Sequence, residues 1–213
     1  YLECPDDLQW IEGANIHMGL SGFDAGEAPN KSLVHHMTIM TMPKEKKIGI
    51  TTRIKEELSI FKEALSKVKI GDEITLFKIG SRMELRREDK PLVLVSMGVA
   101  IATTRPMIVA YMDNKENICK VTNINVDSSE RFIYKDELDK LEDETYKNYW
   151  AKSRTEVYEN LKETLNDTDS IYYIVGSHTF LKDIIKYLKE NNVSDSNIVI
   201  DKREEQLAEF LKG

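Results

Sequence analysis

The sequence has little of several features that would place it in a common class of proteins. It holds only two cysteines, Cys4 and Cys119, which lie far apart in unlike surroundings. A disulfide framework, a cysteine-ligated metal site and an iron–sulfur cluster are therefore not indicated. No apolar run approaches the length that spans a bilayer, and none resembles a signal peptide. A cytoplasmic location is the default expectation.

The sequence also has no excess of positive charge. The formal net charge is −7, with 13 Lys/Arg against 14 Asp/Glu in residues 1–88 and 17 against 23 in residues 89–213. This balance argues against nucleic-acid binding as the main task, because such binding relies on a basic face that neutralises phosphates. What is present is an ordinary globular composition, 41% hydrophobic and 31% charged over 213 residues. That length suits one large domain or two modest ones.

Residues 34–59 predict two strands followed by a helix. Pro43 cannot donate to a strand ladder, so it marks the end of the first strand, and residues 48–54 alternate as a half-buried strand does. The two strands predict a hairpin. Apolar residues then recur at helical spacing, so a helix is expected to begin near Glu57. Ser59 falls in its first turn, where free backbone N–H groups favour an anion.

Short strands around this segment predict a small antiparallel β-barrel. Two strands are expected within residues 1–20, around a turn at residues 5–7, and another over residues 74–77. Residues 21–31 are rich in Gly, Asp, Ala and Asn, which predicts a loop. The barrel is expected to end near Glu88, and residues 86–91 to serve as the linker.

After Pro91 the pattern becomes that of a parallel sheet. Residues 92–97 are an almost continuous apolar run, as in a strand buried on both faces. Further strands are expected at residues 118–124, 171–175 and 198–200, with helical patterns between them, and residues 146–150 are either another strand or an aromatic connector. The predicted fold is therefore an N-terminal antiparallel β-barrel followed by a doubly wound parallel α/β sheet, with domains at residues 1–90 and 91–213.

Three segments fall at the carboxyl edge of this predicted sheet, where doubly wound sheets bind their ligands. Gly98 follows the first strand, and Thr103 or Thr104 can cap a helix whose first turn contains Pro106. The other two segments are Ser153-Arg154 and Gly176-Ser177.

The order of these segments resembles the ferredoxin–NADP reductase superfamily. The family's Arg-x-Tyr-Ser/Thr motif aligns with His35-His36-Met37-Thr38, and its Gly-x-x-Ser/Thr keeps Ser59. Its Gly-x-Gly-x-x-Pro loop aligns with residues 98–103, where Gly98 is retained while Ala100 and Thr103 replace the second Gly and the Pro. Its Tyr-x-Cys-Gly-Pro aligns with residues 173–177, and a Ser-Arg pair found in several relatives aligns with Ser153-Arg154. The resemblance covers nearly the whole chain.

This resemblance implies a flavoprotein oxidoreductase that passes electrons from NADPH or NADH through FAD to a separate acceptor, which could be a ferredoxin, a flavodoxin or a small molecule. Thr38 would be the catalytic residue, with its hydroxyl near the reactive nitrogen of the flavin. Arg53 and Ser59 would hold the pyrophosphate, and Arg154 the 2′-phosphate of NADP. The implied cofactor-binding residues are His35, Met37, Thr38, Ile39, Thr52, Arg53, Ser59, Gly98, Thr103, Ser153, Arg154, Gly176 and Ser177, with no metal ligand.

Each candidate residue also has a purely structural interpretation. Gly98 can be a strand-to-helix turn and Arg53 an outward strand residue, and Ser153 can be a helix cap. Neighbouring strand residues point to opposite faces, so His35 and His36 do not indicate a metal site. The altered motif positions leave a second hypothesis open, a non-catalytic binding module on the same scaffold. Because a strand normally precedes the segment that matches residues 1–3 in the family, an N-terminally trimmed chain is expected.

Overall fold

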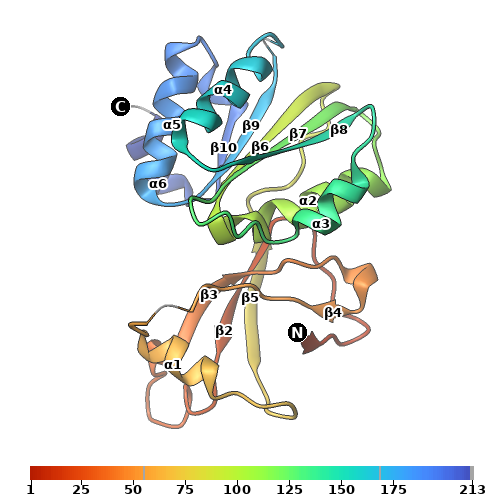
Figure 1. Cartoon of the computed structure of the whole chain (residues 1–213). Helices are drawn as coiled ribbons and strands as arrows, with labels where there is room; N and C mark the ends of the chain where they lie inside the picture. Colours follow the sequence, from red (N-terminus) through yellow and green to blue (C-terminus); the bar gives the residue numbers. More distant parts are fainter. Residues whose placement is uncertain (55, 168, 212–213) are drawn as a thin grey trace.

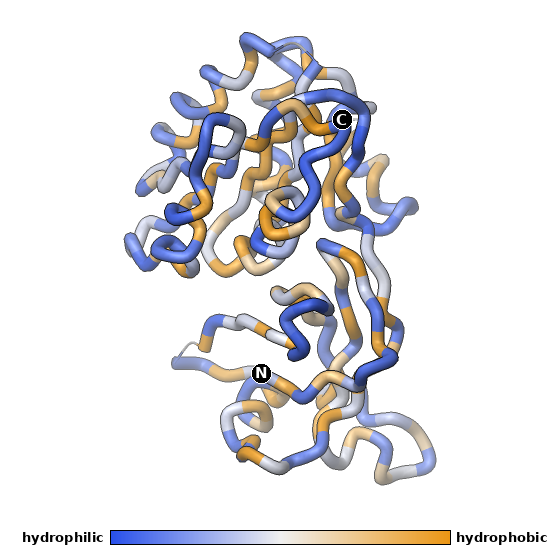
Figure 2. Tube along the Cα trace, turned by 90° about the vertical axis from the view of Figure 1, so that its right-hand side faces the viewer, coloured by the Kyte–Doolittle hydropathy of each residue, from blue (hydrophilic) through white to orange (hydrophobic). Residues whose placement is uncertain are grey.

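The computed structural model describes residues 1–54, 56–167 and 169–211, and Figure 1 shows two lobes that follow one another along the chain. The N-terminal lobe holds antiparallel strands and one helix, and the C-terminal lobe holds a parallel sheet covered by helices. In Figure 2, hydrophobic positions gather inside the upper, C-terminal lobe, while its outer turns are hydrophilic. Within the described ranges, no helix is both long and apolar enough to cross a membrane.

Two antiparallel sheets form the N-terminal lobe. Strands β3 (Val34–Thr38), β2 (Ala14–Gly19) and β5 (Thr75–Ser81) make a three-stranded sheet in that order, and β1 (Leu2–Glu3) pairs with β4 (Lys47–Ile48). Apolar side chains from both sheets share one core. The pairings seen in the described residues do not demonstrate a closed barrel, which stays a prediction.

The hairpin expected within residues 34–54 is wrong in its partners. β3 pairs with β2, and β4 pairs with β1. The two segments meet at a single bridge between Ile39 and Ile50 and at the hydrogen bond from Met40 N to Gly49 O (2.8 Å). Residues 51–54 lie outside any strand. Alternation identifies a half-buried segment, but it does not select the neighbour against which that segment is buried.

Helix α1 (Ile60–Ser66) begins three residues later than expected. Ser59 is its N-cap, since its hydroxyl accepts a hydrogen bond from the Lys62 backbone N–H at 3.3 Å. A cap residue has extended backbone and lies just outside the helix. Phe61 is buried in the core of the lobe and fixes the helix against the sheet. Ser59 therefore precedes the first turn that it was expected to occupy.

The C-terminal lobe is built on a five-stranded parallel sheet with the order β10-β9-β6-β7-β8. The parallel strands predicted from the sequence are confirmed: β6 (Lys90–Met97), β7 (Ile118–Val126), β8 (Tyr146–Ala151), β9 (Ile171–Val175) and β10 (Ile198–Ile200). The chain leaves β6 toward β7 and β8 on one side and returns to β9 and β10 on the other. The topological switch point, where such sheets place their ligands, therefore lies between β6 and β9.

Helices cover both faces of this sheet, as predicted for a doubly wound arrangement. Successive residues of β6 point to opposite faces, so Val93 and Val95 belong to one core while Leu92 and Leu94 belong to the other. The first core is completed by α4 (Arg154–Thr164), α5 (His178–Glu190) and α6 (Glu204–Leu211). The second is completed by α2 (Ile101–Asp113) and α3 (Lys135–Leu138).

Helix α2 starts earlier than the sequence predicted. Gly98 has a φ of 56°, a left-handed conformation that glycine adopts without strain, and it opens a 3-10 turn over Gly98–Ala100 that leads directly into α2. Thr103 and Thr104 are therefore inside the helix rather than at its cap. Thr104 instead donates to the Ile101 carbonyl at 3.3 Å, a common bond for a helical threonine. Pro106 likewise lies inside the helix.

Candidate functional site

The carboxyl edge of the parallel sheet faces the N-terminal lobe. Gly98 follows β6 at this edge, and Asp127 follows β7. A Cβ atom on Gly98 would lie 3.3 Å from Nη2 of Arg53 and 3.6 Å from Oδ2 of Asp127. Arg53 comes from the N-terminal lobe, so the structure brings two of the predicted site residues, Arg53 and Gly98, close together at the carboxyl ends of β6 and β7.

Arg53 is held there by an ion pair. Its Nη2 donates to Oδ2 of Asp127 at 2.7 Å, and the Asp127 side chain is only 5% exposed while that of Arg53 is 48% exposed. Burial alone would raise the pKa of Asp127, but hydrogen bonds from Ser129 and the charge of Arg53 outweigh it and hold the pKa below its ordinary value. A guanidinium has five N–H donors, so Arg53 keeps donors for a second anion.

Thr38 stands at a second contact between the lobes. Its hydroxyl donates to Oδ1 of Asn15 at 3.0 Å, and its oxygen lies 3.3 Å from the Thr103 hydroxyl on α2. Since the Thr38 proton is directed to Asn15, Thr103 is the donor in the second bond. Asn15 in turn donates to both carboxylate oxygens of Asp201 at 3.3 Å. The predicted residues Thr38 and Thr103 are thus joined in one hydrogen-bonded chain.

The other candidates on β3 and just after it have different surroundings. His35 packs against Phe61 with ring centroids 5.0 Å apart, and burial followed by the charge of Lys62 lowers its pKa, so it is neutral at pH 7. Met37 and Ile39 are buried, and Met37 pairs with Ile16 inside the core of the N-terminal lobe. A flavin contact by the side chain of Met37 or Ile39 would need that core to open, and it stays a prediction.

Positive charge gathers where Ser59 was expected to bind an anion. The Ser59 hydroxyl is engaged by Lys62 N, and α1 has only seven residues. Instead, the Lys62 ammonium donates to the Arg53 carbonyl at 2.6 Å, which places these two cationic residues side by side. Thr52 is half-buried in the segment leading to them. The anion-attracting groups of this region are therefore the side chains of Arg53 and Lys62.

The remaining four candidates gather around the first turns of α4 and α5. Ser153 caps α4 and Ser177 caps α5, each accepting a backbone N–H three residues on. Arg154 donates to Asp183 at 2.8 Å and lies over the Phe180 ring at 4.9 Å. A Cβ on Gly176 would come within 2.5 Å of Cδ1 of Phe180. The structure thus brings Arg154 and Gly176 to the same aromatic ring.

Sequence reasoning missed the polar end of β7. Asn123 and Asn125 of β7 and Asp127 directly after it alternate with apolar residues, which was a readable signal of a polar edge. Asn125 donates to the Ser96 hydroxyl at 2.9 Å and to the Gly98 carbonyl at 3.3 Å. In the part of the chain that the structure describes, its buried Oδ1 has no hydrogen-bond partner. An orphaned acceptor beside Gly98 suits a ligand that can donate a hydrogen bond.

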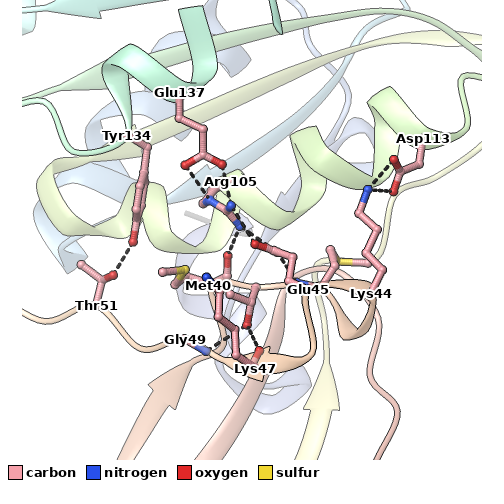
Figure 3. Close-up of polar contacts among 12 residues, drawn as sticks. Met40, Lys44, Glu45, Lys47, Gly49, Thr51, Arg105, Asp113, Tyr134 and Glu137 are labelled. Carbon is pink, nitrogen blue, oxygen red and sulfur yellow. Dashed lines mark hydrogen bonds and ion pairs between the residues drawn. The ribbon is translucent and has the colours of Figure 1, made fainter. Parts of the chain in front are cut away.

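A polar cluster fastens the two lobes next to this edge, as Figure 3 shows. Arg105 of α2 donates to the Met40 carbonyl at 2.7 Å and to both carboxylate oxygens of Glu45 at 2.9 and 3.0 Å. It also pairs with Glu137 of α3. Burial opposes the charge, but the two carboxylates more than offset it, so the pKa of Arg105 is raised. Thr51 and Tyr134 form a further hydrogen bond between the lobes.

The residues present fit an FAD and a pyridine nucleotide better than they fit a metal ion. Arg53 and Lys62 are half-exposed to exposed cations suited to a pyrophosphate, and Gly98 leaves room that a side chain would fill. Asn125 offers an unused acceptor at the same edge. Among residues 1–54, 56–167 and 169–211, no group of three or more His, Cys, Asp or Glu side chains could hold a metal.

Comparisons with known proteins agree with this architecture. No family model matches the chain, and no curated protein matches it. Among solved structures, it is similar to ferredoxin–NADP+ reductase from Plasmodium falciparum, with a TM-score of 0.72 and 12% identity over 93% of this chain and 85% of that one.

Two further structures show the same likeness. The FAD/NAD-binding domain of nitric oxide dioxygenase from Vibrio cholerae has a TM-score of 0.71 and 14% identity, over 91% of this chain and 85% of that one. The CS-b5R domains of human Ncb5or, in their NAD+ form, have a TM-score of 0.71 and 18% identity, over 92% of this chain and 61% of that one. The chain therefore has the fold of the ferredoxin–NADP+ reductases and of related FAD/NAD-binding domains.

Proposed function

We propose that this protein is an oxidoreductase that passes electrons from NAD(P)H through bound FAD to a separate acceptor. The observation that carries the proposal is the meeting of the two lobes at the carboxyl edge of the parallel sheet, where Arg53 lies beside the Gly98 turn and Thr38 contacts Thr103. Transfer between two bound rings requires them to be held in contact. This arrangement places the candidate residues for one cofactor directly against those for the other.

The proposal divides the chain into a flavin-binding domain, residues 1–90, and a pyridine-nucleotide-binding domain, residues 91–213. Arg53 and Lys62 would hold the FAD phosphates, and Thr38 would direct its hydroxyl oxygen toward the flavin. When bound, FAD supplies the redox chemistry, accepting a hydride equivalent from the nucleotide and releasing electrons to the acceptor. The protein supplies position and charge.

On the nucleotide side, Gly98 lets the backbone approach a pyrophosphate closely, as glycine does in other nucleotide-binding turns. Arg154 is the candidate for a further phosphate, because the planar guanidinium fork matches phosphate oxygens. Its pairing with Asp183 reduces the net positive charge it offers. A mutant of the Plasmodium falciparum reductase was solved with 2′P-AMP, and the human Ncb5or domains with NAD+, which supports pyridine nucleotides as a class.

The acceptor is proposed to be a separate redox partner. The structural neighbours include a ferredoxin–NADP+ reductase and a cytochrome P450 reductase from Amycolatopsis. By analogy with these two reductases, a ferredoxin, a flavodoxin or a small molecule would receive the electrons.

The test is an absorption spectrum of the purified protein after incubation with FAD and desalting, repeated after anaerobic NADH or NADPH. Retained flavin bands that bleach with one nucleotide support the proposal and identify the donor.

Arg53→Gln should weaken FAD retention about tenfold or more, as expected for loss of a charge-assisted phosphate contact. Thr38→Ala should retain FAD but slow its reduction. Arg131→Gln, an exposed arginine on the loop after β7, is the matched control and should change neither.

A protein that stays colourless at saturating FAD would contradict the proposal. So would bound flavin that neither nucleotide bleaches. Either outcome would leave the non-catalytic binding module as the better interpretation of the same scaffold.

A further inference from the structure

The segment over residues 51–53 carries the arginine that is the candidate for the FAD phosphates, but its own sheet does not hold it. The segment follows the bridge between Ile39 and Ile50 and lies outside any strand, so no strand ladder fixes its backbone. From the N-terminal lobe, the Lys62 ammonium donates to the Arg53 carbonyl at 2.6 Å. A flexible lysine stem restrains a backbone only loosely. The direction of the Arg53 side chain must therefore be set by other contacts.

The C-terminal lobe holds both ends of this segment from one loop, residues 127–134 between β7 and α3. At the start of the loop, Asp127 accepts a hydrogen bond from Nη2 of Arg53 at 2.7 Å. At its end, the Tyr134 hydroxyl forms a hydrogen bond with the Thr51 hydroxyl, as Figure 3 shows. Two contacts fix the direction of a short segment, whereas one would leave it free to turn.

The Asp127 carboxylate is a fixed anchor. Its side chain is only 5% exposed, and its Oδ1 accepts hydrogen bonds from the Ser129 N–H at 2.9 Å and from the Ser129 hydroxyl at 2.6 Å. Oδ2 is the oxygen that meets Arg53. Because Ser129 holds one carboxylate oxygen, the place of the other does not depend on Arg53. A buried, preformed acceptor thereby orients a cation that is itself half exposed.

Tyr134 has a costly backbone conformation. Its φ is 65°, in the left-handed region, which is unusual for a bulky side chain. It is the N-cap residue of α3, and Cζ of Arg105 lies 5.7 Å from the centroid of its ring. Glycine would adopt this backbone without strain but would supply no hydroxyl. Strained residues persist where the surrounding structure requires them, and they gather at functional sites. Here the strained residue reaches Thr51 across the boundary between the lobes.

We propose that Asp127 and Tyr134 are positioning residues, through which the C-terminal lobe sets the direction of Arg53 for FAD binding. Both act through residues 51–53, Asp127 on the guanidinium and Tyr134 on the backbone that carries it. Their role rests on the proposed function, because Arg53 is the candidate for the FAD phosphates. The affinity of the N-terminal lobe for FAD is then set partly by two side chains of the other lobe.

The first test is amide hydrogen exchange of the flavin-free protein, followed by mass spectrometry. Tyr134→Phe, which removes only the hydroxyl, and Asp127→Asn should each speed exchange in a peptide that covers residues 48–54 and leave β2 unchanged, because only the segment loses a restraint. Tyr149→Phe is the matched control, since its hydroxyl donates to Glu163 within the C-terminal lobe, and it should change neither region. Unchanged exchange over residues 48–54, or equal acceleration in β2, would overturn the proposal.

The second test is the affinity for FAD, measured by titration of flavin fluorescence. Tyr134→Phe should weaken FAD binding about two- to tenfold, as loss of one hydrogen bond does, and Asp127→Asn should weaken it as well. In an Arg53→Gln background, neither substitution should weaken it further, because both act through Arg53. Effects that simply add in that background would contradict the positioning role. Tighter FAD binding by Asp127→Asn would mean that Asp127 competes with the phosphates for Arg53.

Failure of the positioning role and failure of the proposed function give different results. A wild type that binds no FAD at saturating concentration contradicts both. A wild type that binds FAD, together with Tyr134→Phe and Asp127→Asn variants of unchanged affinity, contradicts the positioning role alone and leaves the oxidoreductase proposal in place. Weakened binding in both variants that disappears in the Arg53→Gln background supports both.

Discussion

At the scale of single residues, Lys78 carries backbone strain, with a φ of 54° inside β5. A left-handed conformation costs a non-glycine residue on the order of 1–2 kcal/mol, and glycine loses part of that gain through its greater freedom in the unfolded chain. Lys78→Gly should therefore raise the free energy of unfolding by about 0.5–1 kcal/mol, measured by urea denaturation.

Lys46 gives a parallel test of this prediction. It also has a left-handed backbone, with a φ of 52°, at the end of the 3-10 turn Pro43–Glu45. Lys46→Gly should stabilise the protein to a similar degree, because it relieves the same backbone strain. If neither substitution raises the free energy of unfolding, the left-handed backbone at these two lysines carries no cost.

The candidate site shows which functional residues could be predicted from the sequence and which could not. Thr38 and Gly98 could be selected because each sits in a local pattern of strand, turn and helix. Asp127 and Asp201 could not be assigned roles in the same way, because their partners Arg53 and Asn15 are 74 and 186 positions away. A pair at such separation is set by the docking of the lobes, which local spacing does not encode.

At the scale of elements, the two lobes differ in how far their strands could be predicted. In the C-terminal sheet, the central strands β6 and β9 are buried on both faces, so each appears in the sequence as an apolar run with its own helix after it. In the N-terminal lobe the strands are short and half-buried, and β4 has only two residues. Local alternation located them, but the pairing of β4 with β1 depends on residues more than 40 positions apart in the chain.

The junction between β9 and α5 gives a prediction at this scale. A Cβ at Gly176 would lie 2.5 Å from Cδ1 of Phe180 and 3.3 Å from Cβ of Met97. Phe180 is fully buried, so its ring has no room to move aside. Gly176→Ala should destabilise the protein by about 1–3 kcal/mol, as overpacking does, with a matching fall in the thermal midpoint.

Gly80 is the matched control for Gly176. It lies in β5 and a Cβ there would meet no heavy atom within 4 Å. Gly80→Ala should change the free energy of unfolding by less than about 0.5 kcal/mol, since exposed substitutions without contacts have small effects. Equal destabilisation by both substitutions would mean that the contact with Phe180 does not set the geometry of this junction.

At the scale of the whole molecule, the docking of the lobes depends on Arg105. Its side chain is 9% exposed and joins Glu45 of the N-terminal lobe to Glu137 of the C-terminal lobe. Arg105→Met leaves the Met40 carbonyl without its side-chain donor and the Glu45 carboxylate with only the Met42 N–H. We expect a loss of about 2–3 kcal/mol in the free energy of unfolding and faster proteolysis between the lobes.

Lys44 and Asp113 form a second ion pair between the lobes and provide the control. Both side chains are about half exposed, at 51% and 48%, so solvent screens their attraction. Lys44→Met should cost less than about 1 kcal/mol. If Lys44→Met and Arg105→Met destabilise the protein equally, burial is not what makes the Arg105 cluster the main link.

The Arg105 cluster also makes the docking of the lobes sensitive to acid. Burial alone would raise the pKa of Glu45, but hydrogen bonds from Arg105 and from Met42 N–H, with the charge of Arg105, hold it below its ordinary value of 4.5. A carboxyl whose folded pKa is lowered contributes stability that is fully present above that ordinary value and is lost as the pH falls through the folded pKa.

Glu45→Gln removes this contribution, so the wild type should lose more stability than the variant when urea midpoints are compared from pH 7 to pH 3. In an Arg105→Met background the same substitution should change the pH dependence much less, because the guanidinium that lowers the pKa is gone. An unchanged effect in that background would show that the acid sensitivity of Glu45 does not come from the link between the lobes.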